Sequence, residues 1–525
     1  MSLGQRENAI ARLEQESRWD LVVVGGGITG AGVLREAARR GLKVLLLEQQ
    51  DYSWGTSSRS SKMVHGGLRY IALGDFKLTR EALQERERLL KEAPGLVERM
   101  GYIFPVRGGQ FPGRFSFSAL LELYDRFAGI RDHRWLKAPE LLARVPGLSP
   151  VSLKGACYYT DAVTDDSRLV LRTLQESIAD GGVVVNYMRV RSLLRDGERV
   201  SGVVAEDLVS GRVFNVAADA VVSATGAWAD RLRNELVSEK RIRPLRGSHI
   251  VLTHQRLPVR DALTLLHPKD RRPVFVFPWE GMTVVGTTDL DHRENVDIEA
   301  SINREELEYL YDAVQSQFGG ERLRDIDIIS TWSGVRPVIG SEQNKDPSKE
   351  RRDHAVWSDA GLVTVSGGKL TTFRLIALDA LRAAAKFIGR PLDVTDTGAP
   401  VFTHVAESAA VAALPMARRR QLAGRYGNAL AAWERRGGLD ATAIDGTPYN
   451  WGDVDWVLRE EQVVHLDDVM LRRTRLGNLL PRGGEEILDQ VLARCAAVLA
   501  WDPERQATEK ARYLGIWRRH YALPG

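Results

Sequence analysis

Apolar runs near the N-terminus predict a strand, a helix and a second strand, in that order. Residues 20–24 read Asp-Leu-Val-Val-Val, which is too short for a helix and lacks polar alternation, as in a buried parallel strand. Residues 31–40 follow as a helix that Gly41 ends, and residues 43–47 form the next apolar run. This order predicts a βαβ unit and therefore an α/β fold.

Further apolar runs indicate that this fold is interrupted and then resumed. Strands separated by turn residues are predicted at residues 182–190, 200–206, 213–216 and 219–228. A last strand leads through Gly367-Gly368 into a helix from about residue 371 to 388. The start of that helix is a second helix N-terminus available to polar ligand atoms.

Two insertions and a C-terminal extension differ from this fold in amino-acid composition and in hydrophobic pattern. Residues 91–150 are rich in proline, arginine and aromatic residues. Residues 241–355 contain strand-like runs at 249–253, 274–277 and 282–286 and a polar helix near 304–318. Together these insertions predict an antiparallel-sheet domain. From about residue 400 the chain is rich in Ala, Leu and Arg with helical periodicity, which predicts a C-terminal helical domain.

Composition narrows the function classes. The 73 basic and 69 acidic residues leave a net charge of only +4, which does not indicate nucleic-acid binding. The basic runs at 418–420 and 472–473 are expected to cover a helix surface or a domain interface instead. The 2 cysteines, Cys157 and Cys495, favour a reducing compartment and exclude an iron–sulfur cluster built from this chain alone. We expect no metal site and no membrane-spanning segment.

A glycine motif follows the first strand. Gly25, Gly27 and Gly30 form G-x-G-x-x-G, in which the first glycine makes a tight turn, the second lets backbone amides approach a pyrophosphate, and the third allows close helix–strand packing. Glu48 lies 18 residues after Gly30, at the end of the second strand, where a ribose hydroxyl needs an acceptor. The sequence therefore predicts a dinucleotide site, but FAD and NAD both use this unit.

The run from Ser60 to Tyr70 decides between these cofactors. It reads Ser-Ser-Lys-Met-Val-His-Gly-Gly-Leu-Arg-Tyr, a mixture of hydroxyls, glycines and cations that suits a loop lying against a flat, charged ligand. The segment resembles the flavin-contacting loop of FAD-dependent glycerol-3-phosphate dehydrogenases. Residues 224–226 (Ala-Thr-Gly) and 466–475 resemble further parts of the same family.

The resemblance implies non-covalent FAD and a domain order. A tail (residues 1–18) precedes a discontinuous, Rossmann-like FAD-binding domain (19–90, 151–240 and 356–390), an antiparallel-sheet substrate domain (91–150 and 241–355) and the helical domain (395–525). The residues expected to contact FAD are Gly25, Gly27, Gly30, Glu48, Thr56, Ser57, Ser58, Ser61, Lys62, His65, Gly66, Leu68, Val190, Gly226, Gly368, Lys369, Leu370 and Thr371.

A phosphorylated alcohol substrate would need cations for its phosphate and a base for its hydroxyl proton. The resemblance implies oxidation of sn-glycerol 3-phosphate to dihydroxyacetone phosphate, with hydride transfer from carbon-2 to the flavin and electrons passed on to a quinone. It assigns substrate binding to Arg69, Tyr70, Arg336, Lys369 and Thr288, and catalysis to His249, Arg336 and Asp289. Taken singly, each has a structural alternative: an ion-paired Arg, a core His or an Asp that caps a turn. An activated Arg or a water could also take the proton.

Three alternative functions remain beside this one. A glycerol-3-phosphate oxidase would pass its electrons to dioxygen instead of a quinone, and the sequence does not separate the two. A flavin oxidase of amino or hydroxy acids is disfavoured, because a carboxylate needs one Arg rather than several converging cations. A flavoprotein without catalytic activity is disfavoured because Arg69, His249, Arg336 and Lys369 are all present.

Residues 111–137 combine an apolar, aromatic stretch with basic residues. The apolar members are Phe111, Phe115, Phe117, Leu120, Leu121, Leu123, Tyr124 and Phe127; the basic ones are Arg107, Arg114, Arg126, Arg131, Arg134 and Lys137. Such a segment suits an in-plane membrane contact, and it equally suits an amphipathic helix that covers the substrate domain. We expect a cytoplasmic protein, peripheral on the inner face of the cell membrane under the first interpretation. The resemblance also allows a homodimer.

Overall fold

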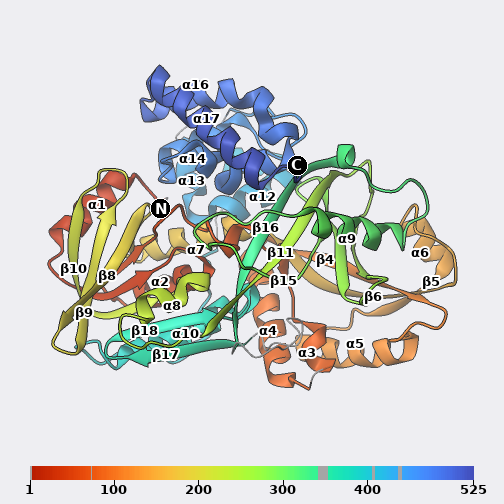
Figure 1. Ribbon diagram of the computed structural model, residues 1–525, viewed down its shortest axis with the longest axis horizontal. Coiled ribbons are helices and arrows are strands. Elements are labelled where there is room, and N and C mark those ends of the chain that lie inside the picture. The colour runs from red at the N-terminus through yellow and green to blue at the C-terminus, as the bar shows by residue number, and fades with distance from the viewer. Residues whose placement is uncertain (1–2, 73, 341–352, 405–407, 436–439) are drawn as a thin grey trace.

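The computed structural model describes residues 3–72, 74–340, 353–404, 408–435 and 440–525. Two sheets lie side by side, and a helical domain formed by the C-terminal part of the chain packs across both of them (Figure 1). None of the helices among the described residues is long and apolar enough to cross a membrane.

The first sheet has the strand order β17-β18-β10-β1-β2-β7, with β8 and β9 extending from β10. Its strands are β1 (Trp19–Val24), β2 (Val44–Leu47), β7 (Val183–Val185), β8 (Met188–Asp196), β9 (Arg199–Asp207), β10 (Val213–Ser223), β17 (His354–Asp359) and β18 (Leu362–Gly367). β1 pairs in parallel with both β2 and β10, and β18 continues the parallel set beyond β10. The carboxyl ends of these strands therefore meet at one edge.

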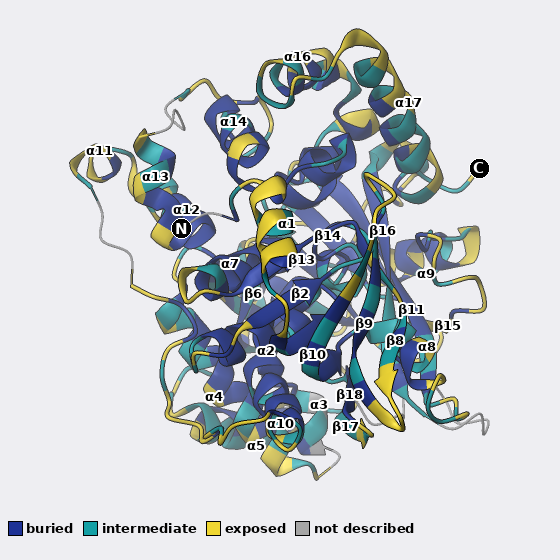
Figure 2. Ribbon diagram, turned by 90° about the vertical axis from the view of Figure 1, so that its left-hand side faces the viewer, coloured by how far each residue is buried: buried dark blue, intermediate teal, exposed yellow. Residues whose placement is uncertain are grey.

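Helices and a hairpin cover the two faces of this sheet. On one face α2 (Ile28–Ala38), α7 (Asp166–Ala179) and α10 (Phe373–Ala385) share a core with β1, β10 and β18. On the other face the β8–β9 hairpin and α1 (Arg6–Gln15) close a second core. Figure 2 shows α2 and β2 almost fully buried, whereas exposed positions gather along β8.

The second sheet is mainly antiparallel and has the order β15-β11-β14-β13-β12-β4-β6-β3, with β16 beside β11 and β5 beside β6. Its strands are β3 (Met63–Val64), β4 (Val97–Arg107), β5 (Arg134–Lys137), β6 (Leu153–Thr164), β11 (Ile242–Thr253), β12 (Ala262–Leu266), β13 (Pro273–Trp279), β14 (Met282–Gly286), β15 (Leu290–Asp291) and β16 (Ile328–Ile339). β3 and β6 come from ranges that the sequence placed in the first domain. They tie the loop after β2 to the second sheet.

Further helices flank the second sheet. α6 (Ala138–Arg144) and α9 (Arg304–Gln315) lie on one side. On the other side lie α3 (Leu68–Ala72), α4 (Phe76–Glu92) and α5 (Arg114–Ala128), with Phe117, Leu121 and Tyr124 of α5 buried in the core.

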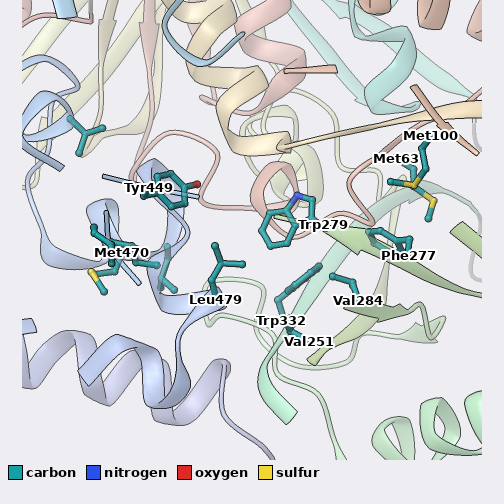
Figure 3. Close-up of a cluster of buried hydrophobic side chains, with 14 of the residues drawn as sticks. Met63, Met100, Val251, Phe277, Trp279, Val284, Trp332, Tyr449, Met470 and Leu479 are labelled. Carbon is teal, nitrogen blue, oxygen red and sulfur yellow. The ribbon is translucent and has the colours of Figure 1, made fainter. Parts of the chain in front are cut away.

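The C-terminal domain shares a hydrophobic core with the second sheet. Its helices are α11 (Ala409–Ala412), α12 (Met416–Tyr426), α13 (Leu430–Arg435), α14 (Trp451–Glu460), α15 (Leu476–Leu479), α16 (Leu488–Leu499) and α17 (Pro503–His520), with a π-helical turn at η7 (Asp468–Arg473). Figure 3 shows Leu479 of this domain next to Trp279 and Trp332 of the sheet, with Met470 farther along the same cluster near Tyr449. The buried apolar contact fixes the domain against the second sheet.

Three predicted elements differ from the structure. α2 begins at Ile28 rather than residue 31, because the glycine turn itself forms the helix N-terminus. Residues 182–190 form two strands, since Tyr187 adopts a left-handed conformation with φ of 52° between them. The runs at 213–216 and 219–228 are one strand, β10, which ends at Ser223. Pattern alone misplaced these breaks because they depend on backbone conformation and on pairing with β9 and β1.

Candidate active site

A cavity of about 470 Å³ opens at the carboxyl ends of β1, β2, β10 and β18. Ligands of open α/β sheets bind at this edge. Of the predicted cofactor contacts, those that line the cavity are Gly25, Gly27, Glu48, Thr56, Ser57, Val190, Gly226, Gly368, Lys369 and Leu370. Residues from six separate stretches of sequence therefore converge on one site.

The glycine turn leaves room for a ligand at the start of α2. Gly25 has φ of +110°, and a Cβ there would lie 2.6 Å from the carbonyl oxygen of Ala224. A Cβ on Gly30 would lie 1.9 Å from the carbonyl oxygen of Gly25, so Gly30 serves close packing of α2 rather than ligand contact. The amide of Ile28 donates to Ser57 Oγ at 3.0 Å, which ties the turn to the following loop. The positive end of α2 thus faces the cavity, with the Ser57 hydroxyl beside its first amide.

Glu48 ends β2 at the cavity wall. One carboxylate oxygen accepts from the amide of Gly26 at 2.6 Å and the other from the amide of Gln50 at 2.8 Å. Burial raises the pKa of Glu48 to about 7. The two backbone donors fix the side chain, and its remaining lone pairs can accept hydrogen bonds from ribose hydroxyls. The glycine turn, the helix N-terminus and this carboxylate together fit a dinucleotide cofactor.

Several lining residues were missed by sequence reasoning. They are Trp54, Arg189, Arg191, Thr225, Trp228 and Arg231. The rings of Trp54 and Trp228 lie 6.0 Å apart, and the indole nitrogen of Trp228 donates to Asp297 at 2.8 Å. The only signal for these positions was the run Ala-Thr-Gly-Ala-Trp after β10, which places Trp228 next to a glycine turn.

Much of the predicted flavin loop supports the cavity without lining it. Lys62 is 1% exposed, and its Nζ donates to the carbonyl of Ser58 at 2.6 Å and to Asp166 at 2.8 Å. Burial, together with the nearby Arg475, lowers the pKa of Lys62 to about 8. The other predicted contacts outside the cavity wall are Gly30, Ser58, Ser61, His65, Gly66, Leu68 and Thr371.

His65, Gly66 and Thr371 do not line the cavity because they are engaged in local contacts. The amide of His65 donates to Thr371 Oγ1, whose hydroxyl donates to the His65 carbonyl, both at 3.1 Å. The amide of Gly66 donates to the hydroxyl of Tyr124 at 2.9 Å, and a Cβ on Gly66 would collide with Leu83. These hydrogen bonds hold residues 65 and 66 of the predicted flavin loop against Thr371 and Tyr124. They thereby help to fix the position of the loop residues that precede them.

His249 lies in the middle of β11, opposite Gly286 of β14 and Trp332 of β16. Its ring stacks on Trp332 with centroids 5.1 Å apart, and its Nε2 is 2.9 Å from Ser61 Oγ. A Cβ on Gly286 would lie 2.1 Å from the imidazole, so glycine makes space for the ring. Within the described part of the chain, the buried Nδ1 of His249 makes no hydrogen bond. Burial, and then the charges of Arg336 and Lys62, hold the pKa of His249 well below its usual range. His249 is therefore neutral at physiological pH and able to accept a proton.

Arg336 projects from β16 toward the end of β14. Its guanidinium is 3.3 Å from Asp289 Oδ1 and donates to Thr287 Oγ1 at 3.2 Å. Asp289 also pairs with Arg272 at 3.1 Å, so this predicted catalytic residue is a partner of two arginines. Thr288 is turned inward: its hydroxyl donates to Glu306 at 2.6 Å and accepts from the amide of Ser248 at 2.9 Å.

Lys369 lies at the cavity wall just before α10. Its Nζ is 3.6 Å from the ring centre of Tyr70, a cation–π contact. A Cβ on Gly67 would lie 2.4 Å from the Tyr70 ring and 2.9 Å from Lys369 Nζ, so Gly67 permits this approach. Arg69 is in α3, and its side chain lies outside the part of the chain that the structure describes.

Known proteins resemble the chain along its length. Residues 20–377 match the model of the FAD dependent oxidoreductase family, and residues 395–506 match that of the C-terminal domain of alpha-glycerophosphate oxidase. The chain is 35% identical over 388 residues to an aerobic glycerol-3-phosphate dehydrogenase of Staphylococcus haemolyticus, covering 73% of this chain and 69% of the relative. For a relative of the same name from Staphylococcus aureus the identity is 35% over 402 residues, covering 75% and 72%.

Solved structures have the same architecture. The glycerol-3-phosphate dehydrogenase from Bacillus halodurans, complexed with FAD, superposes with a TM-score of 0.80 at 27% identity and covers 99% of this chain and 98% of that one. The L-alpha-glycerophosphate oxidase from Mycoplasma pneumoniae, with FAD bound, superposes with a TM-score of 0.56 at 17% identity, covering 73% and 97%. At 17% identity, the similarity to the oxidase shows a common fold only.

Proposed function

The chain belongs to the FAD-dependent glycerol-3-phosphate dehydrogenase family, and we propose on that premise that it oxidises sn-glycerol 3-phosphate to dihydroxyacetone phosphate and passes the electrons to a quinone. The observation that carries this proposal is that His249 is buried and stacked on Trp332, and lies near enough to Arg336 for the arginine charge to lower the histidine pKa, beside a cavity whose glycine turn and Glu48 fit a dinucleotide. A base and a phosphate-binding cation are what oxidation of a phosphorylated alcohol requires.

The side chains divide the work between binding and proton transfer. FAD, when bound in the cavity, supplies the acceptor for the hydride that leaves carbon-2. Arg336 and Lys369 neutralise the phosphate, and Thr287 and Asp289 hold the Arg336 fork in place. His249 takes the proton from the substrate hydroxyl, and Ser61 orients its ring through Nε2. Tyr70, beside Lys369, completes the proposed substrate side, and Arg69 stays a predicted contact.

The electron acceptor separates this function from its rivals. In anaerobic mixing, sn-glycerol 3-phosphate should bleach the yellow flavin absorbance, and a quinone added afterwards should restore it faster than air does. Faster recovery in air would favour the glycerol-3-phosphate oxidase. Bleaching by amino or hydroxy acids but not by glycerol 3-phosphate would favour the other oxidase class. No bleaching by any of these substrates would leave a flavoprotein without catalytic activity.

We expect the FAD to be held without a covalent bond. Among the described residues, neither Cys157 nor Cys495 lines the cavity, and no histidine does. Precipitating the protein with acid should therefore release the yellow colour into the supernatant. Colour that stays with the pellet after washing in denaturant would contradict this expectation.

The proposal places the protein on the inner face of the cell membrane, where a lipid-soluble quinone is accessible. Phe111, just before α5, and Phe115, in its first turn, are 82% and 84% exposed, and Phe76, the first residue of α4, is 49% exposed. Phe117 is buried and stacks on Phe104 with centroids 4.3 Å apart. α5 thus covers the second sheet with one face and presents exposed aromatic side chains at its N-terminal end. Exposed aromatics beside arginines suit a membrane interface.

A double substitution, Phe111→Ser with Phe115→Ser, should weaken co-sedimentation with liposomes that contain anionic lipids. The wild-type protein should sediment at low salt and less at high salt, because part of the attraction is electrostatic. Ile326→Ser is the matched control, since Ile326 is 84% exposed but lies outside this segment. If the double variant and the wild type sediment equally, α5 is not the contact.

A further inference from the structure

An arginine of the C-terminal domain reaches the loop beside the flavin cavity. Arg475 follows η7 and is 2% exposed. Its NH1 donates to the carbonyl of Ser58 at 3.1 Å, and its NH2 donates to Asp165 at 2.8 Å and to Asp166 at 2.5 Å. The Ser58 contact crosses 417 residues of sequence, so it joins the domain matched by the glycerophosphate-oxidase model to the flavin loop.

Asp166, which accepts a hydrogen bond from Arg475, also binds the next residues of the loop. Its Oδ2 accepts from the amide of Ser60 at 2.9 Å and from the Ser60 hydroxyl at 2.7 Å. Its Oδ1 accepts from Lys62 at 2.8 Å, and Lys62 also donates to the Ser58 carbonyl. Arg475, Lys62 and Asp166 thus fix the backbone from Ser58 to Lys62, and these three charged side chains are buried.

The fixed loop meets the proposed base. Ser61, between the anchored residues, places its hydroxyl 2.9 Å from His249 Nε2. Ser60 lines the cavity, and its carbonyl accepts from the indole nitrogen of Trp332 at 3.1 Å, the same indole on which His249 stacks. A shift of the loop would therefore move the group that orients the imidazole as well as the cavity wall.

We propose that Arg475 is a positioning residue for substrate oxidation: by holding Ser58 and Asp166 it sets the place of Ser60 and Ser61, and through Ser61 the orientation of His249. The C-terminal domain is then part of the flavin site rather than an independent module. This inference rests on the proposed function, because it takes His249 as the proton acceptor.

Arginine is required at this position because one side chain serves three acceptors. Its planar fork contacts Asp165, Asp166 and the Ser58 carbonyl at once, and a lysine has a single nitrogen for the same positions. Arg473, two residues earlier, is buried too, but among the described residues its hydrogen bonds go to Asp51 at 2.6 Å and to the carbonyl of Glu461, not to residues 58–62. Arg473 therefore provides a matched control for the loss of a buried interdomain ion pair.

The kinetic test compares Arg475→Lys with Arg473→Lys, both saturated with FAD. We expect Arg475→Lys to lower kcat for sn-glycerol 3-phosphate by about 10- to 100-fold, the cost of a misplaced group near the reacting atoms. KM should change by less than about threefold, since the phosphate cations Arg336 and Lys369 are on other segments. Arg473→Lys should lower Tm while keeping kcat within about threefold of wild type. Wild-type kcat in the folded, FAD-loaded Arg475→Lys protein would overturn the proposal.

A second measurement does not depend on activity. In the flavin-free protein, amide hydrogen exchange of residues 58–62 should be faster in Arg475→Lys than in wild type or Arg473→Lys. If Arg475→Lys does not fold, Asp166→Asn, which keeps the Arg475–Asp165 pair, should give the same faster exchange and lower kcat. Exchange that is unchanged in both variants would overturn the inference. A wild-type protein that does not oxidise glycerol 3-phosphate, with faster exchange in the variants, would instead count against the proposed function alone.

Discussion

Replacing His249 with asparagine should lower kcat for sn-glycerol 3-phosphate by about 10²- to 10⁴-fold, the usual contribution of a positioned general base. The structure gives the physical reason. The imidazole is buried and neutral, because burial and the charges of Arg336 and Lys62 keep its pKa well below the usual range. Asparagine is smaller than the imidazole and fits the space beside Gly286, but it cannot take a proton. Stopped-flow bleaching of the flavin measures the step directly.

His254→Asn is the matched control, because His254 directly follows the end of the same strand and is not among the residues that line the cavity. It should leave the bleaching rate within about twofold of wild type. A His249→Asn protein that bleaches at the wild-type rate would transfer the role of base to a water or to an arginine. FAD content must be equal in all three proteins, so that a lost cofactor is not read as a lost base.

The low pKa of His249 also predicts the pH dependence. In the wild type, protonation of His249 should not limit the bleaching rate until the pH falls well below the ordinary histidine range. Arg336→Met removes one of the two cations that lower this pKa, so the acid limb of the profile should move to higher pH. An acid limb that stays in place in Arg336→Met would show that His249 is not the titrating group.

The dinucleotide half of the site could be predicted from sequence because its signals are local. The glycine turn and Glu48 lie within one βαβ unit, and backbone geometry brings them to one edge of the sheet. The loop that follows was harder. Its composition marked residues 60–70 as ligand-facing, yet Lys62 is directed into a buried pair with Asp166, 104 residues away. No local pattern reveals that partner.

Local sequence also could not predict which residues of α5 are buried, or what the arginines of the C-terminal domain contact. An apolar stretch of residues predicts a helix, but only packing on Phe104 separates buried Phe117 from exposed Phe115. The run Arg472-Arg473 was expected at a helix surface or a domain interface. It is buried at an interface, where both arginines bind Asp51. Arg475 lies beside them in sequence, and its contact with Ser58 becomes visible only when the two domains are placed together.

Recognition of the phosphate should fail selectively when its cations are removed. Arg336→Met and Lys369→Met should each cost about 2–4 kcal/mol of transition-state stabilisation, the range for buried hydrogen bonds to charged groups. That cost corresponds to about a 30- to 700-fold loss in kcat/KM for sn-glycerol 3-phosphate. In Arg336→Met, Asp289 keeps its second partner, Arg272 at 3.1 Å, so the end of β14 retains one ion pair.

Unphosphorylated glycerol separates a phosphate contact from a general loss of activity. It lacks the charge that Arg336 and Lys369 would neutralise, so both variants should oxidise it at close to the slow wild-type rate. Lys386→Met, an exposed lysine just beyond α10, is the matched control and should leave both substrates unaffected. Inorganic phosphate should inhibit the wild type more than either site variant, because it competes for the same cations. Equal losses for glycerol and glycerol 3-phosphate would mean that Arg336 and Lys369 support the cavity rather than bind the phosphate.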